Sequence, residues 1–207
     1  KCYPHTPGID AAGVIEESSI PSFPEGTKVI VTGYDLGMNT HGGFSQYIRV
    51  PFSWVIKCPS NLSLRKAMMI GTAGVTAGLS IDTISQKLQI KGLNVLVSGA
   101  SGGVGSLAIK ILSSLGASVT AVTGKNTSHK FLESLGASFI ISRSGFLKET
   151  KYPLNKGIYD AAIDVVGGDI LSSILSIYFT KALKELPWAT INIFFPSRKS
   201  GFIELCQ

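Results

Sequence analysis

From residue 94 onward the chain alternates between two hydrophobic patterns. Continuous apolar runs such as Val95-Leu96-Val97 are typical of strands covered on both faces. Apolar residues three and four positions apart, which indicate amphipathic helices, follow these runs. The patterns predict strands at residues 95–97, 119–123, 139–141 and 159–166, and helices at residues 104–115 and 127–135 that end at Gly116 and Gly136. Because strands joined by helical crossovers pair in parallel, we expect an α/β fold with helices on both faces of a parallel sheet.

The first third of the chain is patterned differently, because Gly and Pro interrupt its short apolar segments. Strands are predicted at residues 13–15, 28–31, 44–50 and 54–57, which indicates part of a β-rich domain. A helix is predicted at residues 62–86, with Ser63 as its N-cap. Beyond Gly168 an apolar stripe predicts a helix up to Pro187, and residues 191–195 alternate as in one strand. We therefore expect three parts, residues 1–62, 63–176 and 177–207.

Composition narrows the class of partner. Of the 207 residues, 44% are hydrophobic and 15% charged, which favours a globular chain over a disordered one. The formal net charge of +6 is compatible with an anionic partner. Because the basic residues are scattered singly, nucleic acid is not expected, and that alternative rests on net charge alone. Between Thr83 and Leu132 there are five lysines and no Asp or Glu, so positive charge gathers there.

Cysteine usage and the start of the chain bear on location. Cys2, Cys58 and Cys206 are odd in number and far apart, which indicates reduced thiols and a cytoplasmic location. The first residues show no signal-peptide pattern, and no uninterrupted apolar run is long enough to span a bilayer. We therefore expect no membrane association.

A glycine-rich turn follows the first predicted parallel strand. Residues 99–105 are Gly-Ala-Ser-Gly-Gly-Val-Gly, and an amphipathic helix begins within them. Glycine lets the backbone approach a diphosphate without a clashing Cβ, and unpaired N–H groups at the helix start attract phosphate oxygens. The context predicts a dinucleotide site; a turn without a ligand is the alternative. The predicted pyrophosphate-binding residues are Ser101, Gly102, Gly103, Val104 and Gly105.

The end of the next strand bears on the choice of cofactor. NAD-binding units carry an Asp or Glu there, about 20 residues beyond the glycines, for the ribose hydroxyls. This chain has Thr123, Gly124 and Lys125 instead. A carboxylate would repel a 2′-phosphate, whereas a hydroxyl, a backbone N–H and an ammonium donate to it. The sequence therefore predicts NADPH, although Lys125 taken alone also fits a solvated loop lysine.

Four motifs occur in an order shared by one enzyme superfamily. They are Pro7-Gly-Ile-Asp-Ala-Ala-Gly13, Gly42-Gly-Phe-Ser-Gln-Tyr47, Gly71-Thr-Ala-Gly-Val-Thr-Ala77 and the turn at residues 99–105. Over residues 7–175 the chain resembles the zinc-free medium-chain dehydrogenase/reductase superfamily, quinone oxidoreductase type. Residues 33–43 and 65–68 are similar to its acrylyl-CoA reductase-like subgroup.

The resemblance implies a Rossmann domain joined to part of a GroES-like domain, with the nicotinamide in the cleft between them. It implies hydride transfer from NADPH to an activated alkene, a quinone or an α,β-unsaturated acyl-CoA, and a homodimer is the candidate assembly. Tyr34, Asn39 and Thr76 are expected near the nicotinamide, and His41 is the candidate acid. The plainer alternatives are a turn residue for Asn39, a helix hydroxyl for Thr76 and a solvated loop residue for His41.

The lack of a zinc site and two departures from the family pattern complete the expectations. Zinc-dependent relatives place His and Glu where this chain has Ile9 and Asp10, and no other zinc-ligand spacing occurs, so no metal is expected. The chain also looks truncated at both ends, with a divergent tail from residue 177 that lacks the family's fifth strand. A truncated nucleotide-binding module with little or no activity is therefore the alternative to an active reductase.

Overall fold

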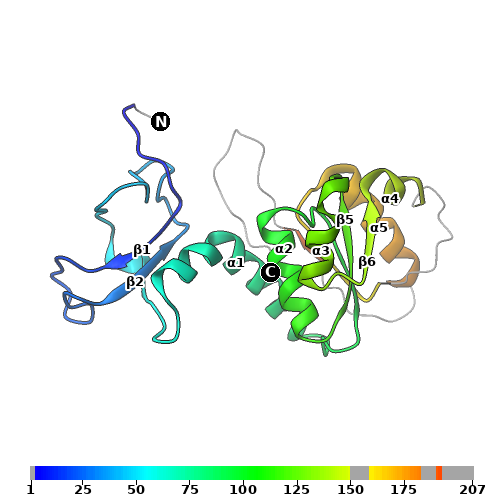
Figure 1. The fold of residues 1–207 in the computed structure, drawn as a ribbon, viewed down its shortest axis with the longest axis horizontal. Helices are drawn as coiled ribbons and strands as arrows, with labels where there is room; N and C mark the ends of the chain where they lie inside the picture. The colour runs from blue at the N-terminus through cyan, green and yellow to red at the C-terminus, as the bar shows by residue number, and fades with distance from the viewer. Residues whose placement is uncertain (1–2, 150–158, 183–189, 193–207) are drawn as a thin grey trace. The chain divides into compact units, whose positions relative to one another are not determined.

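The computed structural model describes residues 3–149, 159–182 and 190–192 (Figure 1). The chain divides into two compact units, Lys1–Val75 and Thr76–Gln207. The division falls inside one helix, α1 (Leu64–Ser85). The three-part division of the chain that the sequence suggested stays a prediction.

The larger unit contains a five-stranded parallel sheet in the order β6-β5-β4-β7-β8. Its strands are β4 (Asn94–Val97), β5 (Ser118–Thr123), β6 (Phe139–Ser142), β7 (Ala161–Asp164) and β8 (Thr190–Asn192). Its helices are α2 (Gly103–Ser114), α3 (His129–Leu135), α4 (Arg143–Glu149) and α5 (Gly168–Ala182), with a 3-10 turn at Asn126–Ser128. The chain leaves β4 toward β5 on one side and later returns to β7 on the other. The end of β4 is therefore a topological switch point, where open parallel sheets bind ligands.

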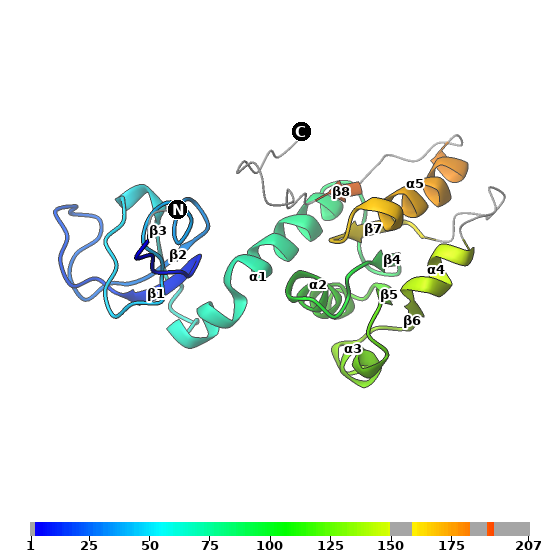
Figure 2. The ribbon, with the colours of Figure 1, turned by 90° about the horizontal axis from the view of Figure 1, so that it is seen from above.

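Both faces of this sheet are covered by helices, as the sequence predicted. Val95 and Val97 point into one hydrophobic cluster and Leu96 into another, because successive strand residues face opposite ways. Figure 2 shows α2 and α3 on one side of β4 and β5, and α4 and α5 on the other. The buried helix residues in the two clusters are at most 4% exposed: Ala77, Ile81, Ile84, Ala108, Ile109, Leu112 and Leu132 in the first, and Phe146, Ile170 and Ile174 in the second.

Two features of the larger unit differ from the sequence predictions. The helix α4 was missed because Gly145 weakens its local signal; burial of Phe146, 2% exposed, outweighs that weakness. The fifth strand expected to be lost is present as β8, which pairs in parallel with β7. The rest of the strand predicted at residues 191–195, and most of the tail, lies outside the described residues. Gly116 and Gly136 end α2 and α3 with φ of 85° and 102°, as predicted.

The helix α1 is kinked, which the sequence pattern did not predict. Its N-cap is Ser63, as predicted, because Ser63 Oγ accepts a hydrogen bond from the N–H of Lys66 at 3.2 Å. Gly71 then adopts φ 49° and ψ −162°, a conformation that L-residues rarely adopt. The Asp10 carboxylate lies at this kink and accepts hydrogen bonds from Thr72 N and Thr72 Oγ1, at 2.9 and 2.8 Å. Asp10 therefore caps the second segment of α1.

By length and composition alone, α1 is apolar and long enough to cross a membrane, so the expectation of no membrane association stays a prediction. Its most apolar window is 39% buried within the structure. Ala77, Ile81 and Ile84 pack into the core of the larger unit. Since a core helix passes the same test, burial of this face accounts for its apolar composition.

The smaller unit contains a three-stranded antiparallel sheet of β1 (Asp10–Val14), β2 (Lys28–Thr32) and β3 (Val55–Lys57), with a 3-10 turn at Phe52–Trp54. The strand predicted at residues 44–50 is wrong, because no strand forms in that described segment. Ser45 Oγ lies 2.5 Å from Tyr47 O and 3.3 Å from Tyr47 N, which makes a local turn. Phe44 and Tyr47 are 75% and 73% exposed, so no packing favours an extended pairing there.

Candidate functional site

The glycine-rich turn joins β4 to α2 at the switch point of the sheet. Its close packing explains its glycines, because a Cβ on Gly105 would lie 2.5 Å from Gly99 O and 2.9 Å from Ala100 Cα. Gly102 is the N-cap of α2 and offers no side chain to the helix. The first N–H groups of a helix have no intrahelical acceptor. The turn therefore presents backbone donors and the positive end of a helix dipole, the arrangement that binds phosphate.

The glycine-rich turn and the end of β5, the two segments in which the sequence predicted cofactor-binding residues, are in contact. Thr123 Oγ1 lies 3.2 Å from Ser101 Oγ, and the N–H of Lys125 donates to Thr123 Oγ1 at 3.1 Å. Thr123 is 2% exposed, whereas Gly124 and Lys125 are exposed. The Thr123 hydroxyl and the Lys125 N–H are thus engaged within the protein, whereas the Lys125 ammonium takes no part in these two bonds.

A buried polar network beside the turn was missed by the sequence analysis. Asp164, at the end of β7, is 3% exposed, and its carboxylate accepts a short hydrogen bond from the fully buried Ser98 hydroxyl. It also accepts from the N–H groups of Val166 and Gly167, at 3.3 and 2.9 Å. Ser98 Oγ in turn accepts from Val165 N at 3.0 Å.

This network sets the distance between two turns. A Cβ on Gly99 would lie 2.5 Å from Cγ2 of Val165, so the turn after β7 packs directly against the glycine-rich turn. Asp164 and Ser98 therefore position the wall of the candidate dinucleotide site. An Asp inside an apolar run that leads into Gly167-Gly168 was the available signal in the sequence.

The candidate catalytic residues Tyr34, Asn39 and His41 lie on one loop of the smaller unit. Tyr34 is 63% exposed, has a φ of 54° and stacks on Trp54, with ring centroids 5.4 Å apart. Asn39 Nδ2 donates to Asp35 Oδ1 at 2.9 Å. The loop thus holds its polar groups by contacts with itself and its neighbours.

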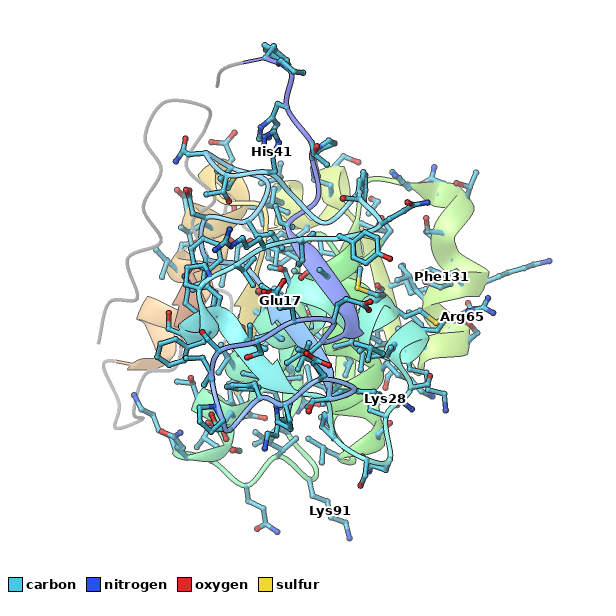
Figure 3. All side chains as sticks on the ribbon, turned by 90° about the vertical axis from the view of Figure 1, so that its left-hand side faces the viewer. Glu17, Lys28, His41, Arg65, Lys91 and Phe131 are labelled. Carbon is cyan, nitrogen blue, oxygen red and sulfur yellow. The ribbon has the colours of Figure 1, made fainter. Side chains whose placement is uncertain are left out.

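His41 lies near the N-terminal segment, and Figure 3 shows its ring beside that segment. Its Nδ1 accepts from Thr6 N at 3.4 Å, and its ring stacks on that of His5 with centroids 6.2 Å apart.

Thr76 lies on α1 as the first residue of the larger unit, and it is half-buried. Its carbonyl accepts a hydrogen bond from Ser80 Oγ at 2.9 Å. The roles predicted for these residues remain predictions.

Within the described residues, no group of three or more His, Cys, Asp and Glu side chains is placed to hold a metal ion. Ile9 is 43% exposed, and Asp10 is engaged by Thr72. The position that supplies a carboxylate ligand in zinc-dependent relatives therefore has a structural role in this chain.

Two family models match the chain. Residues 1–60 match the alcohol dehydrogenase GroES-like domain, and residues 103–180 match the zinc-binding dehydrogenase family. The first match covers the small β-rich unit, and the second begins within the glycine-rich turn.

Curated relatives match over most of this chain. It is 45% identical to the putative quinone oxidoreductase YhfP of Bacillus subtilis and 42% identical to the acrylyl-CoA reductase AcuI of Ruegeria pomeroyi. Each match covers 84% of this chain and 53% of the relative. The chain thus spans about half the length of these relatives.

Solved structures agree in fold. The yhdH oxidoreductase of Salmonella enterica, in complex with NADP, is 42% identical with a TM-score of 0.79, over 85% of this chain and 54% of that one. The yhfP protein of Bacillus subtilis, with NAD bound, is 44% identical with a TM-score of 0.80, over 86% and 54%. Two proteins equally similar to this chain thus carry different dinucleotides.

Proposed function

The chain belongs to the medium-chain dehydrogenase/reductase superfamily, and from that membership we propose that it binds NADPH and reduces an activated alkene without zinc. The proposed acceptor is a quinone or an α,β-unsaturated acyl-CoA, the substrates named for its relatives YhfP and AcuI. The observation that carries the proposal is the glycine-rich turn at the end of β4. Its packing and its uncapped helix start fit a pyrophosphate.

The choice of NADPH rests on this chain's own residues, because the similar structures hold NADP in one case and NAD in the other. No carboxylate follows β5; Gly124 and Lys125 are exposed there. A charge-assisted hydrogen bond contributes about 1.5 to 3 kcal/mol, so Lys125→Ala is expected to weaken NADPH binding roughly 10- to 100-fold. NADH binding should hardly change. Equal losses for the two cofactors in a fluorescence titration would contradict the assignment.

When bound, NADPH supplies a hydride to the acceptor. The chain's contribution is then to bind and orient the dinucleotide, through the donors of the turn and the wall that Asp164 and Ser98 set. Reduction of an alkene also requires a proton, and His41 and Tyr34 are the proposed sources because both are exposed and titratable. Asn39 and Thr76 are proposed to orient the acceptor or the nicotinamide.

The test of the proposal combines binding and turnover on the full 207-residue chain. NADPH binding is measured by titration, and its oxidation is then followed with a small quinone and with acryloyl-CoA. Oxidation that depends on the acceptor supports the reductase. Absence of NADPH binding would contradict the whole proposal.

A second candidate function is a nucleotide-binding module with little or no turnover. It is favoured by the contrast between the turn, whose packing is complete, and the exposed apolar side chains of the smaller unit, including Phe44 and Tyr47. Tight NADPH binding without oxidation by either acceptor would support this alternative over the reductase.

The absence of zinc is proposed from the same site. Asp10 accepts two hydrogen bonds from Thr72, so zinc binding would compete with the cap of α1. Metal analysis after dialysis is expected to find less than one zinc per chain. A stoichiometric, retained zinc ion would contradict this part of the proposal.

Location and partners complete the proposal. We propose a cytoplasmic protein with a small-molecule electrophile as its partner, since Cys58 is a free thiol and dinucleotide chemistry needs no macromolecule. A homodimer is the proposed assembly, which sedimentation of the purified chain would test.

A further inference from the structure

Two aromatic side chains from different segments of the smaller unit stack on each other. Strands β2 and β3 pair antiparallel with Val31 opposite Val55, so the end of β2 lies beside the start of β3. Tyr34 follows β2 by two residues, and Trp54 directly precedes β3. Their rings are nearly parallel, with centroids 5.4 Å apart and an angle of 5° between the planes. The pairing of the two strands therefore brings together rings that lie 20 positions apart in the sequence (54 minus 34).

The backbone of Tyr34 is held in a conformation that a tyrosine rarely adopts. Its φ is 54°, in the left-handed region, and it directly follows Gly33, whose φ is 75°. A bulky residue stays in this region only where the surrounding structure imposes it. On one side the N–H of Gly33 donates to Ile9 O at 3.1 Å, and on the other Leu36 is fully buried. The backbone is thus fixed on both sides of Tyr34, and the position of its ring depends on what that ring contacts.

Trp54 is the more firmly anchored partner of the stack. It is half-buried, whereas Tyr34 is 63% exposed. The N–H of Trp54 donates to Pro51 O at 3.0 Å, and β3 begins at the next residue. The indole therefore offers the Tyr34 ring a fixed surface in the stacked geometry that aromatic pairs favour. Among the described residues no hydrogen bond reaches the Tyr34 hydroxyl, so the stack leaves this group available to a ligand.

We infer that Trp54 is a positioning residue, whose indole holds the Tyr34 ring in the orientation from which its hydroxyl gives a proton to the acceptor. This inference rests on the proposed reductase function, in which Tyr34 is one of the two proton sources. In that reduction the acceptor takes a hydride from NADPH and a proton from the phenol O–H, and water returns a proton to the phenolate. Because Trp54 acts through Tyr34, its removal should lower turnover and leave dinucleotide binding unchanged.

The test measures NADPH oxidation with a small quinone by the full 207-residue chain. Trp54→Leu removes the stacked ring, and a displacement of about 1 Å at a reacting group can cost about 100-fold in rate. We expect kcat to fall roughly 10- to 100-fold, more than the KM for the quinone changes, while NADPH affinity stays within about twofold. Trp54→Phe keeps a ring that can stack and should recover most of the turnover. If circular dichroism shows that Trp54→Leu does not fold, Trp54→Met replaces it, because its flexible side chain fills irregular space without a ring.

Phe52→Leu is the matched control. Phe52 belongs to the same 3-10 turn as Trp54 and is 60% exposed, so this change removes a neighbouring aromatic ring and leaves the stack in place. Its kcat should stay within about twofold of the parent value, as for a surface substitution away from the site. A loss as large as that of Trp54→Leu would assign the effect to the turn as a whole and overturn the role of the stack.

A double-mutant cycle separates positioning from general support of the fold. Tyr34→Phe removes the hydroxyl and keeps the ring. If Trp54 acts through that hydroxyl, adding Trp54→Leu to Tyr34→Phe should lower kcat by less than about twofold, since coupled residues give non-additive losses. Losses that multiply in full would overturn the inference. Parent-like turnover in Tyr34→Phe would overturn it as well.

The remaining outcomes separate this inference from the proposed function. Parent-like turnover in Trp54→Leu would overturn the role of Trp54 and leave the reductase proposal standing. NADPH binding without turnover in the parent chain would overturn the inference in favour of the nucleotide-binding module. Absence of NADPH binding in the parent chain would overturn both the proposed function and this inference.

Discussion

The glycine-rich turn of the larger unit and the loop at residues 33–43 of the smaller unit both carry candidate site residues, but they are held by different means. The turn is fixed by backbone packing and by the buried Asp164, which is 3% exposed. The loop is fixed by its own polar contacts, such as Asn39 to Asp35, and Tyr34 is 63% exposed. Dinucleotide binding is therefore expected to follow from the core of one unit, whereas acceptor binding depends on side chains that this core does not hold.

The largest loss of stability is expected for a substitution of Gly105, where the surrounding backbone leaves no space for a side chain. Gly105→Val should lower the free energy of unfolding of the larger unit by about 3 kcal/mol, because its Cβ would meet Gly99 O and Ala100 Cα. NADPH binding should be lost with it. Chemical denaturation followed by circular dichroism, with a parallel titration, checks both.

The control for that variant is Gly78→Ala in α1, where a Cβ would meet nothing within 4 Å. In a helix this change should raise the free energy of unfolding by roughly 0.5 to 1 kcal/mol. If Gly105→Val proves as harmless as Gly78→Ala, the turn is not the rigid element that the comparison takes it to be.

A smaller loss is expected from the polar network. Asp164→Ala leaves the Ser98 hydroxyl and two backbone N–H groups without their acceptor, at a cost of about 2 kcal/mol. Asp164→Asn retains acceptor capacity and should cost less. Urea denaturation of the two variants compares their losses in free energy of unfolding. If Asp164→Asn costs as much as Asp164→Ala, the negative charge itself holds the two turns together.

The contrast between the two sites also explains what the sequence predicted and what it missed. The strand at Val95–Val97, the turn and the helix stripe of α2 are encoded by neighbouring residues, so local periodicity and glycine spacing identified them. The Ser98–Asp164 contact joins residues 66 positions apart, and no local pattern contains it. Sequence reasoning predicted the pyrophosphate site on the turn but could not identify the contacts that hold that turn.

In the smaller unit, too, the predictions failed where the structure depends on residues far apart in the sequence. The kink at Gly71 was missed because the helix pattern of residues 62–86 is continuous, while the cause lies at Asp10, 62 positions before Thr72. The strand expected at residues 44–50 has no pairing partner among the described residues. A strand forms only where a neighbouring strand can pair with it, and the local sequence pattern does not identify that neighbour.

An intermediate effect is expected at the kink itself. Asp10→Ala removes the cap of the second segment of α1 and should cost about 1 kcal/mol, whereas Asp10→Asn keeps an acceptor for Thr72 and should cost less. Hydrogen exchange followed by mass spectrometry should locate faster exchange around Thr72. Faster exchange spread evenly over the larger unit would argue against a local capping role.

The smallest effect on stability is expected for a substitution of His41. At this residue the expected effects on stability and on turnover differ most. His41 is exposed, its contact to Thr6 N is long at 3.4 Å, and its other contact is the stacked ring of His5. His41→Gln should therefore change the free energy of unfolding by no more than about 0.5 kcal/mol. A general acid contributes roughly 10²- to 10⁴-fold to a rate, so turnover should fall if His41 supplies the proton. Steady-state kinetics with a quinone, beside denaturation of the same variant, separate the two quantities. Since NADPH binding is proposed to depend on the other unit, its affinity should not change. A lower NADPH affinity in His41→Gln would contradict the assignment of the two roles to two independent sites.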